Sequence, residues 1–376
     1  VCCRTTIGFG SPNKQGTASA HGAALGDEEI ALTRKQLNWH ADAFEIPEHV
    51  RADWDQTAAG ASRQTDWQTS FEAYAQSHPE LACEFMRRMA GELPNGWDVA
   101  VNQMALAEQA DPTDRATRKS SQQVIGAVAE GLPELFGGSA DLTSSNLTKW
   151  SGATDEQHLS YGVREFGMTA ISNGMLLHGG LRPFTGTFLV FMEYARNALR
   201  LAALMGIPNI FVYTHDSVAV GEDGPTHQPI EQITNLRTTP NLHTWRPCDT
   251  VETAVAWRCA VQEQNTPSAL IFTRQNTEAQ NRDAATFANI ERGGYVLRAC
   301  EGRPDLILIG TGSEVELVVA ASTKLTQVGY KVQVVSMPFV RSLWRRIRCT
   351  ETRCCRRRYE HASPSKRVMA TIGLNL

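Results

Sequence analysis

Long apolar runs are missing from this sequence. No window approaches the roughly 18 consecutive apolar residues that a transmembrane helix needs, and residues 1–4 lead into no apolar segment of a signal peptide. The nine cysteines are an odd number, and no pair at zinc-binding spacing is joined to a second such pair. We therefore expect no membrane span and no disulfide framework, and we predict a reducing, cytoplasmic location.

Glycine and proline are not in excess, since 29 glycines and 16 prolines in 376 residues exclude a collagen-like or low-complexity chain. The length predicts two or three domains of about 100–200 residues each. Charge is uneven: residues 341–376 hold nine Arg, one Lys and two Glu, a net +8 in a chain of net charge −4. We interpret residues 339–376 as an aberrant basic tail translated out of frame. A nucleic-acid-binding arm and a solvated basic tail are the alternatives.

Short apolar segments alternate with helical periodicity after a turn at residues 111–114. Strands are predicted at 135–138, 183–190, 210–213 and 269–272, and helices at 28–39, 118–132, 166–177, 191–205 and 249–262. This alternation predicts βαβ units and an α/β fold with a parallel sheet. A second unit begins near residue 294, with strands at 305–309 and 331–335 around a helix at 314–325. Ser313 and Glu316 have the spacing of a capping box for that helix.

A polar segment follows the predicted strand at 210–213 and contains His215, Asp223 and His227. In a parallel sheet the carboxyl ends of the strands form the binding crevice, so we expect these side chains at a ligand site. The alternative is a structural loop whose histidines bind only backbone groups.

Four further candidates lie at or near the starts of predicted helices. Glu165 begins an apolar helix, where a carboxylate is either a partner of the helix dipole or a functional group. Phe188, Phe191 and Tyr194 are spaced by three residues, which is also typical of a stripe that faces the core.

Arg118, Ser145 and Arg274 lie near the ends of predicted elements. Arginines in such places can hold a phosphate through two parallel hydrogen bonds, although most arginines are simply surface residues. The Gly-x-Gly at residues 310–312 lacks the third glycine of a dinucleotide motif, so a plain strand-to-helix turn is preferred to a nucleotide site.

Taken together, in order and spacing, these motifs resemble transketolase, the thiamine-diphosphate-dependent transferase. The matching segments are 7–14, 20–22, 137–142, 162–168, 188–196, 213–229, 246–249, 273–276 and 310–316. The resemblance covers residues 5 to about 338 and implies a parallel-sheet pyrimidine-binding domain plus a truncated C-terminal α/β domain.

The resemblance also implies the domain limits. Residues 1–82 correspond to the end of the diphosphate-binding domain and a linker, 83–293 to the pyrimidine-binding domain, and 294–338 to the start of the C-terminal domain. The family's Gly-Asp-Gly signature is missing, because the one Gly-Asp pair, Gly26–Asp27, is followed by Glu28. We therefore expect most of the N-terminal domain to be absent and the chain to be part of a longer enzyme.

The activity implied by the resemblance is the reversible transfer of a two-carbon glycolaldehyde (ketol) unit from a ketose phosphate to an aldose phosphate through a thiamine-diphosphate ylid. Glu165 matches the glutamate that hydrogen-bonds the aminopyrimidine ring. A protonated carboxyl there favours the imino tautomer, which can accept the thiazolium C2 proton, and the cofactor then acts as the electron sink. Phe191 matches the aromatic residue packed on the pyrimidine, with Phe188 and Tyr194 nearby.

Three histidines, His21, His215 and His227, match active-site histidines that contact substrate or cofactor. Of these, His21 and His227 are expected to be catalytic, because imidazole can relay the hydroxyl protons that move during ketol transfer. The remaining substrate-binding residues implied are Asp223, which matches the contact to a donor-sugar hydroxyl, and Arg118, Ser145 and Arg274, which match the sugar-phosphate site.

The cofactors implied are thiamine diphosphate and Mg²⁺ or Ca²⁺, with the metal site in the missing domain and no metal ligand in this chain. The partners implied are sugar-phosphate substrates and, in the full-length enzyme, a second copy in a homodimer. Neither nucleic acid nor membrane is expected. A pentose-phosphate role and a carbon-fixing role remain equally open. The alternatives are a related enzyme such as dihydroxyacetone synthase, or an inert fragment.

Overall fold

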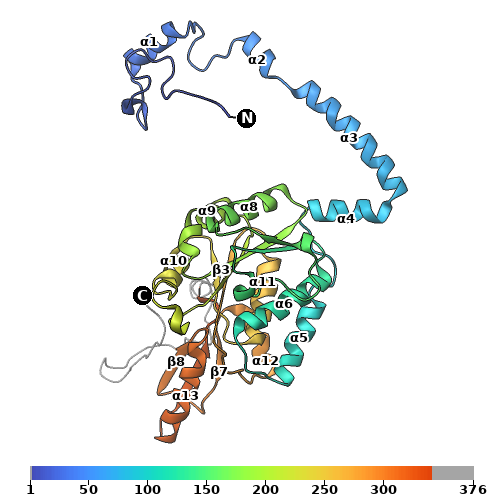
Figure 1. The fold of residues 1–376 in the computed structure, drawn as a ribbon, viewed down its shortest axis with the longest axis vertical. Helices are drawn as coiled ribbons and strands as arrows, with labels where there is room; N and C mark the ends of the chain where they lie inside the picture. The colour runs from blue at the N-terminus through green and yellow to red at the C-terminus, as the bar shows by residue number, and fades with distance from the viewer. Residues whose placement is uncertain (1, 341–376) are drawn as a thin grey trace. The chain divides into compact units, whose positions relative to one another are not determined.

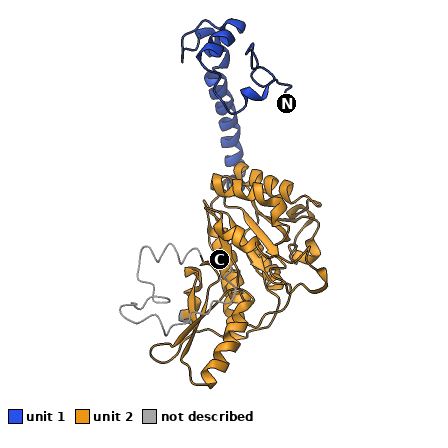
Figure 2. Cartoon of the chain, turned by 90° about the vertical axis from the view of Figure 1, so that its left-hand side faces the viewer, with its two compact units in different colours: residues 1–82 blue, residues 83–376 orange. Residues whose placement is uncertain are grey.

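The structure is a computed structural model that describes residues 2–340, and it divides into two compact units, residues 1–82 and residues 83–376 (Figure 2). The predicted basic tail lies outside the described residues, apart from its first two positions. One of these, Phe339, is buried and stacks on Trp245 with ring centroids 4.6 Å apart. No helix within residues 2–340 is long and apolar enough to cross a membrane.

The first unit is a loop followed by helices. These are η1 (Ala18–Ala20), α1 (Asp27–Gln36), α2 (Glu48–Trp54) and α3 (Thr57–Ser77), and α4 (Pro79–Met89) runs into the second unit. The loop folds around the buried carboxylate of Glu29, which accepts hydrogen bonds from the Ser11 hydroxyl and from the backbone and side chain of Asn13, the latter two at 2.9 Å. These hydrogen bonds, led by that of Ser11, lower the pKa of Glu29. Residues 11–13 of the matching segment 7–14 are therefore held in a structural loop by Glu29 of α1.

The second unit contains the remaining elements (Figure 1). Its helices are α5 (Val99–Ala110), α6 (Thr117–Gly131), α7 (Thr143–Asn146), η2 (Asp155–Gln157), α8 (Glu165–His178), α9 (Met192–Met205), η3 (Gly221–Asp223), α10 (Gln232–Thr238), α11 (Thr250–Gln262), α12 (Ala284–Phe287), η4 (Ile290–Arg292) and α13 (Glu314–Gln327). Its strands are β1 (Leu135–Ser139), β2 (His158–Ser160), β3 (Arg182–Phe188), β4 (Ile210–Thr214), β5 (His243–Trp245), β6 (Ser268–Phe272), β7 (Tyr295–Arg298), β8 (Leu306–Gly310) and β9 (Val332–Ser336).

Six strands form one parallel sheet in the order β2-β1-β3-β4-β6-β5, which confirms the predicted α/β fold. Residues alternate between its two faces along each strand. On β4, Ile210 and Val212 face a core built with α5, α6 and α11, whereas Phe211 and Tyr213 face a core built with α9 and α10. Both faces are therefore covered by helices, which explains why the strand is apolar throughout.

The second sheet has three strands in the order β7-β9-β8, with β8 and β9 parallel and β7 antiparallel to β9. Helix α13 packs against β8 and β9, and the two sheets belong to the same compact unit. Strands β2, β5 and β7, none longer than four residues, were not predicted.

The predicted capping box at α13 is wrong. Ser313 has helical backbone angles and makes no side-chain cap, and the Glu316 carboxylate accepts from the backbone N–H of Glu278 at 2.9 Å. The Ser313 hydroxyl instead accepts a hydrogen bond from Arg246 at 3.2 Å and donates one to Glu314. The Ser313 hydroxyl therefore binds the Arg246 side chain in place of a backbone N–H of the helix.

Candidate functional site

The site is built at the carboxyl edge of the six-stranded sheet. The register pairs Phe188 with Thr214 and Thr214 with Phe272, so β3, β4 and β6 end level with one another. The residues that follow these strands therefore leave the sheet side by side, including His215 after β4 and Arg274 shortly after β6. This is the edge at which ligands bind in open parallel sheets.

An aromatic cluster covers the ends of β3 and β4. Phe188 stacks on His215 with centroids 3.8 Å apart and on Phe191 at 5.7 Å. The ring of His227 meets Phe191 edge-on at 5.2 Å and Phe188 at 5.9 Å. Tyr194 lies 6.0 Å from Phe191 and is 67% exposed. Phe188 is buried but Phe191 only half-buried, so the cluster offers an aromatic face to a planar ligand.

Glu165 is the first residue of α8, as predicted, and its side chain is buried, 7% exposed. Within residues 2–340, no group donates a hydrogen bond to its carboxyl. Its oxygens are not among the fully buried side-chain atoms that lack a partner, so they remain accessible to a ligand.

His215 is held in an unusual backbone conformation, with φ of 62°, and its side chain is 3% exposed. Burial lowers the pKa of its imidazole to about 3, with further contributions from the positive charges of Arg118 and Arg274. The ring is therefore neutral at physiological pH, and it can donate through one nitrogen only.

A chain of hydrogen bonds holds the ring of His215 from one side. The Ser139 hydroxyl accepts from the backbone N–H of Leu142 and donates to the Asn146 side-chain oxygen at 3.1 Å. The Asn146 amide donates to the Thr214 hydroxyl at 2.7 Å, and that hydroxyl lies 2.9 Å from Nδ1 of His215. The threonine oxygen can accept a second hydrogen bond or donate its own proton, so its contact with Nδ1 holds the ring in place with either tautomer of His215. Ser139, Asn146 and Thr214 were not predicted as site residues, because only the fold brings their side chains together.

Arg118 and Arg274 are brought together by a pair of threonines. The backbone N–H of Thr117 donates to the Thr273 hydroxyl at 2.9 Å, and the backbone N–H of Thr273 donates to the Thr117 hydroxyl at 2.7 Å. This reciprocal contact pins the start of α6 to the end of β6. The next residue on each segment is an arginine, so two positive charges converge.

The two arginines are poorly neutralised. Arg118 donates to the backbone oxygen of Ser145 at 2.7 Å, while its buried Nε has no partner among the described residues. Burial, followed by the charge of Arg274, lowers the pKa of Arg118. The acid paired with Arg274 is Glu222, 3.9 Å away and 86% exposed. Like charges with so little compensation favour a bound anion.

The remaining predicted residues lie in the same polar segment or in the first unit. Asp223 is exposed and ends η3, and His227 is half-buried with Nδ1 2.9 Å from the Thr226 hydroxyl. His21 is exposed in the first unit, where it follows η1. The structure thus brings together Phe188, Phe191, His215 and His227 directly, with Arg118 and Arg274 beside them. Within residues 2–340, no group of three or more His, Cys, Asp or Glu side chains is arranged to hold a metal ion.

A doubly covered parallel sheet with an aromatic face and a cationic end at its carboxyl edge is typical of an α/β ligand-binding domain. Comparisons with known proteins narrow this class. Residues 113–280 match the transketolase pyrimidine binding domain, residues 1–94 the transketolase thiamine diphosphate binding domain, and residues 293–372 the transketolase-like C-terminal domain.

Individual relatives agree with these matches. Transketolase 2 of Aliivibrio fischeri is 56% identical over 345 residues, which cover 90% of this chain and 52% of that protein. Transketolase 1 of Escherichia coli is 57% identical over 344 residues, with the same two coverages. A crystal structure of transketolase from Pichia stipitis in complex with sedoheptulose-7-phosphate superposes with a TM-score of 0.81 at 39% identity, covering 90% of this chain and 51% of that one.

The chain belongs to the transketolase family. It spans about half the length of the curated relatives that it matches.

Proposed function

We propose that the protein containing this chain is a transketolase, which reversibly transfers a two-carbon ketol unit from a ketose phosphate to an aldose phosphate. The observation that supports this most strongly is the convergence of two poorly neutralised arginines with a neutral histidine, beside an aromatic cluster, at one sheet edge. The membership in the transketolase family and the sugar phosphate in the related Pichia stipitis structure point in the same direction.

The cofactor end of the site consists of Glu165, Phe188, Phe191 and Tyr194. The half-buried ring of Phe191 fits an aminopyrimidine, and the buried carboxyl of Glu165 lacks the partner that a ring nitrogen would supply. When bound, thiamine diphosphate supplies the nucleophilic carbon and the electron sink for breaking the carbon–carbon bond. The task of Glu165 is to hold a proton at the pyrimidine nitrogen.

The substrate end consists of Arg118, Ser145, His215 and Arg274. The arginines offer planar forks for phosphate oxygens, and the neutral imidazole of His215 offers one further hydrogen-bonding group. His227 and His21 are proposed to move hydroxyl protons, and Asp223 to bind a sugar hydroxyl.

A homodimer is the proposed assembly. Large apolar side chains on and beside α8 and α9 are exposed, which is unusual for a monomer. They are Val163 (75%), Phe166 (51%), Ile171 (49%), Leu177 (62%), Tyr194 (67%), Leu201 (47%), Leu204 (70%) and Met205 (55%). The two helices pack on each other, so these residues form one candidate face for a second copy (Figure 1).

Mg²⁺ or Ca²⁺ is the proposed counter-ion of the cofactor's diphosphate, because such oxygens suit hard cations. No residue of this chain is assigned as its ligand. The cytoplasm remains the proposed compartment, supported by the six cysteines of the described residues, all of which are free. The pathway served, pentose-phosphate or carbon-fixing, is left open.

Acceptor profiling of the complete protein tests the proposal. With thiamine diphosphate and Mg²⁺, we expect ketol transfer from a ketose phosphate to aldose phosphates at rates well above transfer to formaldehyde. A preference for formaldehyde would point to the dihydroxyacetone synthase reaction instead. Absence of transfer to any aldehyde would contradict the proposed activity. Chelation of divalent ions should abolish the activity, and their return should restore it.

A further inference from the structure

Arg246 lies outside the proposed site but is attached to the loop that carries His215. It follows β5 and is 4% exposed. Its Nε and Nη2 donate to Oδ2 of Asp216 at 3.0 and 2.6 Å. Asp216 is the next residue after His215, so the arginine binds the loop that carries the imidazole of His215.

The other side of the same guanidinium holds the start of α13. Nη2 of Arg246 donates to Oε1 of Glu314 at 2.9 Å, Nη1 donates to its other carboxylate oxygen, and Nη1 reaches the backbone oxygen of Thr311 at 3.2 Å. The backbone takes part as well, because the N–H of Arg246 donates to the Pro338 oxygen at 2.8 Å. One residue therefore joins the six-stranded sheet to the segment from residue 294 onward.

The turn between β8 and α13 is shaped to admit this side chain. Gly312 has φ of 56°, and a Cβ at that position would lie 2.7 Å from Cγ of Arg246. A larger residue would therefore clash with the arginine as well as strain the backbone. The close approach requires glycine here, which accounts for a glycine in the motif at residues 310–316.

Asp216 depends on this contact. It is 2% exposed, and its Oδ1 has no hydrogen-bond partner among the described residues. A buried carboxylate without a counter-charge is strongly unfavourable, so Asp216 stays in place only while Arg246 does. The adjacent His215 has a positive φ, a conformation that persists only where its surroundings enforce it.

We propose that Arg246 is a positioning residue: by holding Asp216 and Glu314 at once, it lets the C-terminal segment fix the loop of His215 and so set the affinity for phosphorylated sugars. We call Asp216, Arg246 and Glu314 the brace. The inference rests on the proposed function for its substrate, but the brace itself is a structural claim that can be tested without activity.

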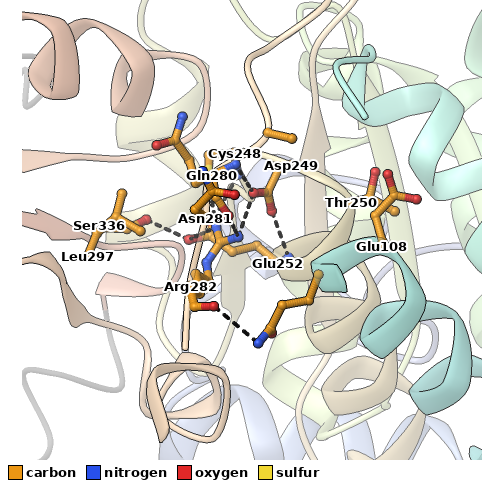
Figure 3. Close-up of polar contacts among 12 residues, drawn as sticks. Glu108, Cys248, Asp249, Thr250, Glu252, Gln280, Asn281, Arg282, Leu297 and Ser336 are labelled. Atoms are coloured by element: carbon orange, nitrogen blue, oxygen red, sulfur yellow. Dashed lines mark hydrogen bonds and ion pairs between the residues drawn. The ribbon is translucent and has the colours of Figure 1, made fainter. Parts of the chain in front are cut away.

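A second polar link between the two sheets provides a matched control. Arg282 donates to Asp249 at 2.6 Å (Figure 3). It also donates to the Tyr295 hydroxyl at 2.6 Å, and Tyr295 donates to Glu252 at 2.7 Å. This cluster joins α11 to β7, and among the described residues it makes no hydrogen bond or ion pair with residues 214–229. Tyr295→Phe therefore weakens the joint between the sheets without touching the brace.

The experiment compares Glu314→Ala with Tyr295→Phe in the complete protein. Amide hydrogen exchange over residues 214–220 should be faster in Glu314→Ala and unchanged in Tyr295→Phe. The KM for a ketose phosphate should rise by roughly 2- to 30-fold in Glu314→Ala, the usual range for a change that weakens coupling between sites. Its kcat, and the KM for the same ketose without phosphate, should stay within about 2-fold. Glu314→Gln, which keeps hydrogen bonding but not charge, should lie between.

The outcomes separate the brace from the proposed function. If amide hydrogen exchange over residues 214–220 is unchanged in Glu314→Ala, the brace is overturned, whatever the ketol-transfer activity of the variant. Faster exchange with an unchanged KM overturns its effect on phosphate affinity. If Tyr295→Phe changed the exchange and the KM as much as Glu314→Ala does, any weakening of the contact between the two sheets would be enough to produce these effects. That result would also overturn the brace. A wild-type protein with no ketol transfer contradicts the proposed function, and hydrogen exchange still decides the brace.

Discussion

Two clusters of charged side chains in the second unit differ in how far their charges are neutralised. Around Arg282, the guanidinium and the Glu252 carboxylate are both fully buried, and each charge has partners of the opposite sign or a hydroxyl. Around Arg118 and Arg274, the ion pair among the described residues joins Arg274 to the exposed Glu222 at 3.9 Å, and Arg118 takes part in none. Both clusters are polar, so polarity alone does not distinguish them.

This difference in neutralisation indicates which cluster can bind a ligand. The Arg282 cluster is saturated, and burial followed by the nearby acids raises the pKa of the Cys248 thiol, so that its sulfur stays protonated and unreactive. The cluster at the sheet edge keeps unsatisfied donors, and its positive charges help to hold His215 neutral. A saturated network stabilises the fold, whereas an unsatisfied one favours binding. The following predictions test this contrast in order of expected effect.

The largest effect is expected at Glu165, the buried carboxyl without a partner. Glu165→Gln in the complete protein should lower kcat by roughly 10²- to 10⁴-fold, the scale of a lost proton-transfer group. The fold should be retained, because no internal hydrogen bond is broken. Steady-state kinetics and thermal unfolding check this. Glu156→Gln, at an exposed position on η2, is the control and should behave as wild type. Near-normal turnover of Glu165→Gln would remove this residue from the cofactor site.

The next effect is expected at Arg274. Arg274→Ala should weaken binding of a sugar phosphate by about 1.5–3 kcal/mol, because a hydrogen bond to a charged group is lost. Arg274→Lys keeps the charge but not the fork and should be intermediate. Calorimetric titration with the ketose phosphate measures the change. An unchanged affinity in both variants would show that the convergence of Arg274 with Arg118 has no role in binding phosphate.

The saturated cluster should respond in stability and not in activity. Tyr295→Phe leaves the Arg282 Nε–H without its acceptor, so the free energy of unfolding should fall by about 1–3 kcal/mol. Denaturant unfolding of the purified protein measures this. Tyr330→Phe, at a position that is 50% exposed, controls for the loss of a hydroxyl and should cause no change. If Tyr295→Phe changed the KM without lowering the free energy of unfolding, the Arg282 cluster would act in binding and not in stability, which contradicts the account.

The smallest effect concerns pH. The folded-state pKa of His215, about 3, lies below the ordinary value because of burial first and the two arginines second. Below about pH 6.5 this histidine is protonated in the unfolded chain but stays neutral in the folded chain. The free energy of unfolding therefore decreases as the pH falls from about 6.5 towards the folded-state pKa. His215→Gln should therefore show a shallower loss of unfolding free energy between neutral and mildly acidic pH. His178→Gln, at an exposed position, controls for the removal of one histidine. Equal slopes in wild type and His215→Gln would contradict the neutral imidazole.

Much of the fold was predictable because strands covered on both faces are apolar along their whole length. The segment at 210–213 is such a strand, and β4 is observed at Ile210–Thr214. Strand β5 has three residues, His243–Trp245, and so short a segment carries no periodicity to detect. The capping box failed because its residues had other partners: Arg246 lies 67 positions before Ser313 in the chain, a contact that local spacing does not encode.

The candidate site was predictable only in part, for the same reason. His215 and Arg274 stood out by residue type and by their place after predicted strands. Ser139, Asn146 and Thr214 did not, since small polar residues are common and only the sheet register aligns them. The roles assigned to the site residues, including that of His21 in the first unit, remain predictions, as do the domain limits at residues 82, 293 and 338.

One measurement tests the central claim most directly, namely that the unsatisfied groups form one site with a cofactor end and a phosphate end. It is kcat/KM for one ketose with and without its phosphate, in wild type, Glu165→Gln and Arg274→Ala. Glu165→Gln should lower both values by the same factor, because it acts on the cofactor. Arg274→Ala should lower the value for the phosphorylated ketose only. Equal losses on both substrates in Arg274→Ala, or no loss in either variant, would contradict the account.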